Sequence, residues 1–192
     1  MFASMPSKSS RPVVGVMGAS GEPHAERSRR VGTWIARAGY HLLTGGGPGV
    51  MAAVTEAFVS VPDRRGLAIG ILPASGRRGL EGPAGRPPPG YPNPWVELAI
   101  ATHLDSLGER GGDAWSRNHV NVLSSDVLIF LPGSAGTASE AKLAVRYGKP
   151  SIAYLDTRAD VPDLPDAIPV EPELARIETF VRDACAHRRG GR

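Results

Sequence analysis

Two side chains in the second half of the chain, Arg117 and Glu140, could do chemistry on a phosphorylated ligand. Glu140 follows an apolar run at residues 127–131 and a glycine-rich turn at residues 132–136. A strand that leads through such a turn into a helix places backbone N–H groups and the positive helix end in front of a phosphate. We predict a helix over residues 139–147, which puts the Glu140 carboxylate in its first turn beside that pocket.

The turn itself supplies the candidate phosphate-binding residues Gly133, Ser134, Gly136 and Thr137. The Thr137 hydroxyl could cap the helix, donate a hydrogen bond to a phosphate, or do both. Glu140 could instead serve only as an acid that the helix dipole favours near its positive end. Because two more glycine turns accompany this one, we favour a functional role for Glu140.

Two earlier glycine turns, at residues 18–21 and 45–51, add candidate binding residues, because glycine lets backbone N–H groups approach an anion closely. The candidates are Gly18 and Ser20 in the first turn, and Gly46, Gly47, Gly49 and Met51 in the second. Taken alone, each turn could serve only to reverse the chain. The second turn is not a Walker A loop, and the first lacks the glycine spacing of a dinucleotide-binding fingerprint.

Arg117 and Asn118 fall within a helix that we predict over residues 114–123. The planar guanidinium of Arg117 suits phosphate or ribose oxygens, although a surface salt bridge is the simpler interpretation. Asn118 joins it as a candidate binding residue. His119 has no partner at metal-ligand spacing, and the five histidines form no zinc pattern, so no metal site is expected.

Short apolar runs alternate with helical patterns along the chain, which predicts an α/β fold. We expect a Rossmann-like, doubly wound, mostly parallel sheet with helices on both faces. Strands are expected at residues 12–17, 40–44, 67–72, 95–101, 127–131 and 151–155, and helices at 24–38, 50–59, 114–123, 139–147 and 173–187. The glycine turns follow the first, second and fifth strands, at the carboxyl ends where such sheets bind ligands. One shared ligand site is therefore expected.

The chain is expected to hold one nucleotide-binding domain over residues 12–188, preceded by a flexible tail at residues 1–11. Residues 73–94 contain seven prolines and five glycines and show no apolar periodicity. A loop of this length is usually either disordered or a functional lid, and we favour disorder.

Composition excludes several classes of protein. The 192 residues carry a net charge of +3 and a lone cysteine, Cys185, which rules out an internal disulfide framework. No apolar run is long enough to span a membrane, and the N-terminus lacks a secretory signal, so we expect a cytoplasmic protein. Arginine clusters are present, but without the interleaved aromatic residues typical of RNA binding, so we do not expect a nucleic-acid partner.

Residues 45–51, 117–118 and 132–140 together resemble the LOG / molybdenum-cofactor-carrier group of Rossmann-like proteins, often labelled lysine decarboxylase-like. The resemblance covers about residues 12–156. It implies a nucleotide-type ligand and a homodimer. The decarboxylase label finds no support, because no lysine lies in a setting suited to a Schiff base with pyridoxal phosphate.

The LOG branch of this group consists of phosphoribohydrolases with a Pro-Gly-Gly-x-Gly-Thr-x-x-Glu motif and an Arg-Lys pair. Gly136, Thr137 and Glu140 match that motif, whereas Ser134 replaces its second glycine. Arg117 matches the arginine of the pair. Asn118 replaces its lysine, and an Arg-Asn pair is more similar to the cofactor-carrier side of the group.

The resemblance implies a protein that binds a nucleoside 5′-monophosphate and hydrolyses its N-glycosidic bond to free base and ribose 5-phosphate. Ionised Glu140 would stabilise positive charge at the ribose C1′, as in glycoside hydrolysis, and Arg117 would fix the phosphate or the leaving side. The alternative is a non-catalytic binder or carrier of a phosphorylated cofactor such as molybdenum cofactor. Neither interpretation requires a resident cofactor; the expected bound species are a nucleotide, phosphate or molybdenum cofactor.

Overall fold

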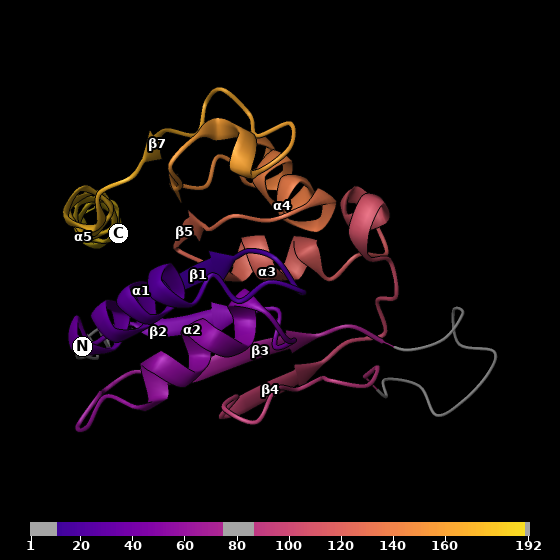
Figure 1. The fold of residues 1–192 in the computed structure, drawn as a ribbon, viewed down its shortest axis with the longest axis horizontal. Coiled ribbons are helices and arrows are strands. Elements are labelled where there is room, and N and C mark those ends of the chain that lie inside the picture. Colours follow the sequence, from indigo (N-terminus) through magenta and orange to yellow (C-terminus); the bar gives the residue numbers. More distant parts are fainter. Residues whose placement is uncertain (1–10, 75–86, 191–192) are drawn as a thin grey trace, which may run out of the picture.

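The computed structural model describes residues 11–74 and 87–190, which form a seven-stranded sheet in the order β4-β3-β2-β1-β5-β6-β7. In chain order the strands are β1 Val13–Met17, β2 His41–Thr44, β3 Ala68–Leu72, β4 Leu98–Ala101, β5 Val127–Phe130, β6 Ser151–Tyr154 and β7 Val170–Glu171. Every neighbouring pair is parallel. Strands β4 and β7 lie at opposite edges of the sheet (Figure 1).

Strand β1 lies between β2 and β5, and the chain reverses its direction of winding there. Residues 14–17 pair with residues 127–130 of β5 on one side, and residues 13–15 pair with residues 41–43 of β2 on the other. Because the three strands are parallel, their carboxyl ends meet at one edge of the sheet. Such a switch point is where open α/β sheets bind their ligands.

Five α-helices cover the two faces of the sheet: α1 Ala25–Arg37, α2 Val50–Val59, α3 Asn118–Ser124, α4 Ala135–Arg146 and α5 Leu174–Gly190. Helices α1, α2 and α5 share one buried apolar cluster with the sheet, and α3 and α4 share a second. Two buried layers against a parallel sheet confirm the predicted Rossmann-like, doubly wound α/β fold.

The helix boundaries differ from the prediction in places that matter for the site. Helix α4 begins at Ala135, so Glu140 lies in its second turn and not in the first. Helix α3 begins at Asn118, which leaves Arg117 as its N-cap residue. A short 3-10 helix, η1 Gly108–Gly112, precedes α3 in a segment for which the sequence predicted no helix.

Part of the predicted loop is defined in the structure. Residues 1–10 of the predicted tail and residues 75–86 of the predicted loop lie outside the described residues. Residues 87–94 are described, and Asn93 among them is buried. The Asn93 backbone N–H donates to the Gly46 carbonyl at 2.7 Å, and its side-chain Nδ2 donates to the Gly47 carbonyl at 3.0 Å. This end of the segment is therefore fastened to the second glycine turn.

In the part of the chain that the structure describes, no helix is long and apolar enough to cross a membrane.

Close packing of α1 on α2 depends on Gly32, because a Cβ at this position would collide with the Val54 carbonyl oxygen. We predict that Gly32→Ala lowers the free energy of unfolding by about 1–3 kcal/mol, despite the better helix propensity of alanine. Urea denaturation measures this change. Gly21→Ala is the matched control, because a Cβ there would meet no atom within 4 Å. Equal stability of the two variants would contradict the prediction.

Candidate functional site

The three glycine turns meet through backbone hydrogen bonds at Ala19. The Ala19 N–H donates to the Pro132 carbonyl in the third turn at 3.0 Å, and the Val50 N–H of the second turn donates to the Ala19 carbonyl at 2.9 Å. Gly49 has a φ of +69°, and a Cβ there would collide with the backbone of Ala19 and Ser20. Glycine is therefore required at position 49 for the first two turns to touch.

A pocket of about 160 Å³ opens beside this junction, at the carboxyl ends of the central strands. Nine of the residues singled out from the sequence line it: Gly18, Ser20, Met51, Arg117, Asn118, Ser134, Gly136, Thr137 and Glu140. Gly45, Tyr91, Leu107 and Gly108 also line it and were not predicted. The structure thus brings residues from all three turns into one pocket.

The other four predicted residues, Gly46, Gly47, Gly49 and Gly133, are not among the lining residues. They shape the turns instead. Gly46 adopts a φ of +72°, and Gly47 leaves room for the Tyr91 ring. Gly133 leaves room for the Thr137 hydroxyl, and its N–H donates to the Asp160 carbonyl at 3.0 Å. Their direct contact with a ligand stays a prediction.

The N-terminus of α4 faces the pocket. Its N-cap residue, Ser134, makes no side-chain capping hydrogen bond, so the first N–H groups of the helix are left without a cap. Gly136, Thr137 and Glu140 lie on one side of the helix, because residues three or four positions apart are neighbours on its surface. Backbone donors and a carboxyl group therefore face the same space.

Glu140 is almost fully buried, with 8% of its surface exposed. Burial raises the pKa of its carboxyl group to about 7, against the lowering effects of a hydrogen bond from Asn121 and the positive charge of Arg117. The Asn121 Nδ2 donates to Glu140 Oε1 at 2.8 Å. At neutral pH the carboxyl group is therefore divided between its protonated and ionised forms.

Arg117 is also buried, and it ties the ends of two strands together. Its Nη1 donates to the Ile71 carbonyl in β3 at 2.5 Å and to the Gly45 carbonyl after β2. Among the described residues no carboxylate lies within 4.0 Å of the guanidinium to form an ion pair, and its Nε has no hydrogen-bond partner. Burial lowers the Arg117 pKa, while Tyr91 and Glu140 act in the opposite direction. The pocket wall thus carries a positive charge that no acidic residue of the described segments neutralises by direct contact.

Sequence reasoning missed Asn121 and Tyr91. Asn121 lies on α3 four residues after Arg117, and its side chain is fully buried among apolar residues. That helical spacing could have identified it, because a buried amide needs a hydrogen-bond partner. Tyr91 comes from the proline-rich segment and offers no periodic signal. His119, which the sequence left without a role, contacts the Tyr147 hydroxyl through Nδ1 at 2.6 Å.

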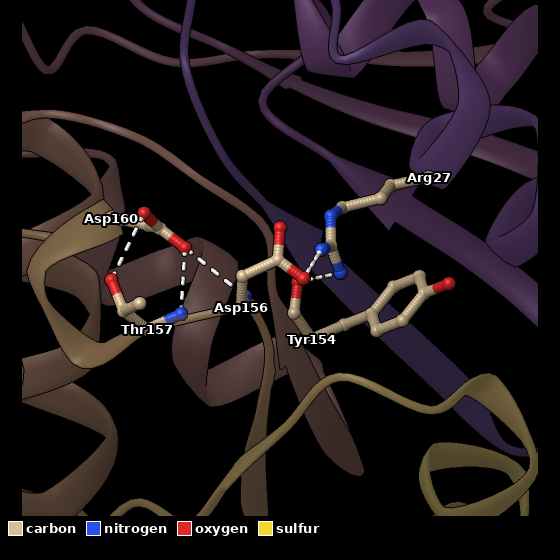
Figure 2. A network of polar contacts seen from close by, with 5 residues as sticks. All are labelled: Arg27, Tyr154, Asp156, Thr157 and Asp160. Carbon is tan, nitrogen blue, oxygen red and sulfur yellow. Dashed lines mark hydrogen bonds and ion pairs between the residues drawn. The ribbon is translucent and has the colours of Figure 1, made fainter.

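A polar network of Arg27, Tyr154, Asp156, Thr157 and Asp160 contacts the third turn through the Asp160 backbone (Figure 2). Arg27 of α1 pairs with Asp156 at 2.5 Å and lies over the Tyr154 ring, with its Cζ 4.6 Å from the ring centroid. The Asp160 carboxylate accepts N–H groups from Asp156 and Thr157, and these bonds lower its pKa. Because the Asp160 carbonyl holds the Gly133 N–H, the network fixes the turn in place.

We predict that Glu140→Gln changes how stability depends on pH. An acid with a raised pKa in the folded chain contributes stability below its ordinary pKa of about 4.5, and this contribution is lost as the pH rises to about 7. Glutamine cannot ionise and escapes that loss. Relative to the unchanged chain, the variant should gain about 2 kcal/mol between pH 5 and pH 8 in urea denaturation.

The matched control for this measurement is Glu56→Gln, at an exposed position on α2. We expect the free energy of unfolding of the control to change between pH 5 and pH 8 by the same amount as that of the unchanged chain. A Glu140→Gln variant whose stability difference is the same at pH 5 and pH 8 would contradict the assignment of a raised pKa.

Comparison with known proteins places this chain in a family. The molybdenum cofactor binding protein from Rippkaea orientalis has a similar structure, with a TM-score of 0.63 and 26% identity, over 91% of this chain and 98% of its own. The molybdenum cofactor carrier protein from Chlamydomonas reinhardtii gives a TM-score of 0.63 and 26% identity over 92% and 99%. An uncharacterised protein from Archaeoglobus fulgidus is 34% identical over 139 residues, which are 71% of this chain and 75% of that protein. The model of the SLOG cluster4 family matches residues 11–169, and the chain belongs to that family.

Proposed function

We propose that this protein binds a phosphorylated small molecule in the pocket beside the three glycine turns and acts as its carrier. The favoured cargo is a phosphorylated organic cofactor of the molybdenum cofactor kind. Support comes from the two similar structures, one of a cofactor binding protein and one of a cofactor carrier protein. The Arg117-Asn118 pair, which resembles the carrier side of the group, points the same way.

The observation that carries the proposal is the buried positive charge of Arg117 beside the uncapped N-terminus of α4. A buried charge that no carboxylate contacts directly is costly, and an anionic ligand in the pocket would supply a contacting counter-charge. The N–H groups around Gly136 and Thr137 would donate hydrogen bonds to the phosphate oxygens. The charge of Arg117 and the N–H groups of α4 therefore both favour a phosphate in this pocket.

The phosphate end of the cargo fits the donors present. The volume of about 160 Å³ is below the roughly 300 Å³ at which ordinary ligand pockets begin, so the pocket would enclose the phosphate and its neighbouring atoms. The remainder of the cargo would extend toward Tyr91 and Leu107. The cargo's own chemistry would be used elsewhere, since a carrier only holds it.

Hydrolysis of a nucleoside 5′-monophosphate is the second candidate, and buried Glu140 is the observation that favours it. Groups with strongly shifted pKa values in pockets are often catalytic. One observation weighs against it. Glu140 shares its proton at neutral pH, whereas stabilisation of positive charge at C1′ needs the ionised form.

We also propose that the protein is cytoplasmic and assembles as a homodimer. The support for assembly is the edge strand β4, where Leu98 and Ile100 are 45% and 42% exposed. Apolar side chains along an unprotected strand edge favour contact with another chain.

Thr137→Val is expected to weaken ligand binding, because it removes one hydroxyl donor beside the α4 N-terminus and keeps the shape of the side chain. A hydrogen bond to a charged group is usually worth enough to change the dissociation constant for ribose 5-phosphate or AMP by about ten-fold or more. Isothermal titration calorimetry measures the dissociation constants of both ligands. The same variant should retain less molybdenum after incubation with molybdenum cofactor and gel filtration.

The matched control is Thr179→Val on the far helix α5, where the threonine hydroxyl is exposed and donates to the Ala175 carbonyl. It should bind both ligands as the unchanged chain does. If the unchanged chain binds neither phosphorylated ligand at millimolar concentration, nor the cofactor, the proposed function is wrong.

The carrier interpretation predicts that AMP is recovered intact after long incubation at high protein concentration. Chromatography of the mixture would detect free adenine. Adenine release that Glu140→Gln abolishes while AMP binding persists would replace the carrier interpretation with the hydrolase. The pH series should then be extended above 7, because a role for ionised Glu140 makes the rate rise through its pKa of about 7.

A further inference from the structure

We propose that Tyr91 forms a second subsite in the same pocket, where its ring stacks on a flat heteroaromatic ring of the ligand. This inference rests on the proposed function and deepens it. It assigns to one residue the binding of the planar ring that such a ligand carries beside its phosphate, as purine nucleotides and phosphorylated pterins do.

The segment that carries Tyr91 is fastened to the second glycine turn. Besides its two hydrogen bonds to the Gly46 and Gly47 carbonyls, Asn93 accepts the Trp95 N–H on Oδ1 at 3.2 Å. The Tyr91 N–H donates to the Pro88 carbonyl at 3.2 Å. The backbone is thus held on both sides of Tyr91 before any ligand arrives.

The Tyr91 ring fits against two residues of the pocket. It occupies the space beside Gly47 that a side chain at that position would fill. On another side the Arg117 guanidinium lies over the ring, with its Cζ 5.4 Å from the ring centroid. A guanidinium and an aromatic ring attract each other at this distance. The ring remains partly exposed and lines the pocket, so surface is left for a ligand.

The pocket lining divides into two chemical groups. Ser134, Gly136 and Thr137 supply polar donors at the α4 N-terminus, whereas Met51, Tyr91 and Leu107 supply apolar surface. Leu107 is 40% exposed, although leucine is usually buried. Met51 is buried, but a ligand made only of sugar and phosphate would leave Leu107 and the Tyr91 ring exposed to water. A ligand with a flat ring would cover them.

The test compares AMP with ribose 5-phosphate, which differ only in the adenine ring and the atoms at C1′. Stacking of one base on an aromatic side chain typically changes affinity by about ten-fold or more. By calorimetry we expect the unchanged chain to prefer AMP by about that factor. Tyr91→Leu should lose the preference for AMP, so that its dissociation constants for AMP and ribose 5-phosphate become nearly equal. Tyr91→Phe, the matched control, should keep it.

A second measurement does not depend on the Tyr91→Leu variant folding. Tyr91→Trp keeps an aromatic face at this position, and AMP should quench its added fluorescence relative to the unchanged chain, whereas ribose 5-phosphate should not. A stacked purine ring accounts for that difference.

Three results would overturn the inference. Tyr91→Leu could retain the preference for AMP. It could weaken the binding of both ligands equally, which would mean that Tyr91 only stabilises the turn at Gly47. AMP could leave the fluorescence of Tyr91→Trp unchanged. In each case the unchanged chain still binds phosphorylated ligands, so the proposed function stands. Binding of neither ligand by the unchanged chain would instead remove both proposals.

Discussion

The structure of the site depends on two backbone hydrogen bonds at Ala19, which join the turn after β1 to the turns after β2 and β5. Parallel strands in the order β2-β1-β5 bring the three turns to one edge, but only close backbone contact makes them one surface. Gly49 permits that contact, because any side chain there would enter the first turn. Sheet topology and one glycine together create the pocket.

Two buried ionisable groups give the pocket its charge. Arg117 extends from the start of α3 to the carbonyls of Gly45 and Ile71. The same side chain therefore links the ends of β2 and β3 and brings a positive charge to the pocket wall. Glu140 is held by Asn121 and carries a raised pKa. Local structure and electrostatics are therefore linked, since the contacts that position each group also remove it from water.

The order of the first six strands and the five α-helices could be predicted from the sequence, because apolar runs and glycine stops are local signals. Strand β7 was missed, because two residues are too few to give a periodic pattern. That the three glycine turns lie together could also be predicted, because turns that follow parallel strands lie at the carboxyl ends of the strands, where such sheets bind ligands. The contacts of Arg117 could not be predicted, because its partners lie 72 and 46 residues away and are backbone carbonyls without a sequence pattern. The start of α4 was missed because Gly136 resembles a turn residue, although glycine is tolerated in a first helical turn.

Charge balance gives a physical reason to favour a carrier over a hydrolase. A phosphate dianion in the pocket would share it with the Arg117 guanidinium and the Glu140 carboxyl group, both of which line it. Its negative charge would compensate the arginine and would further disfavour ionisation of Glu140. Protonated Glu140 is then a hydrogen-bond donor that holds the anion, whereas stabilisation of positive charge at C1′ needs the ionised form. In this pocket, anion binding and that catalytic step place opposite demands on one carboxyl group.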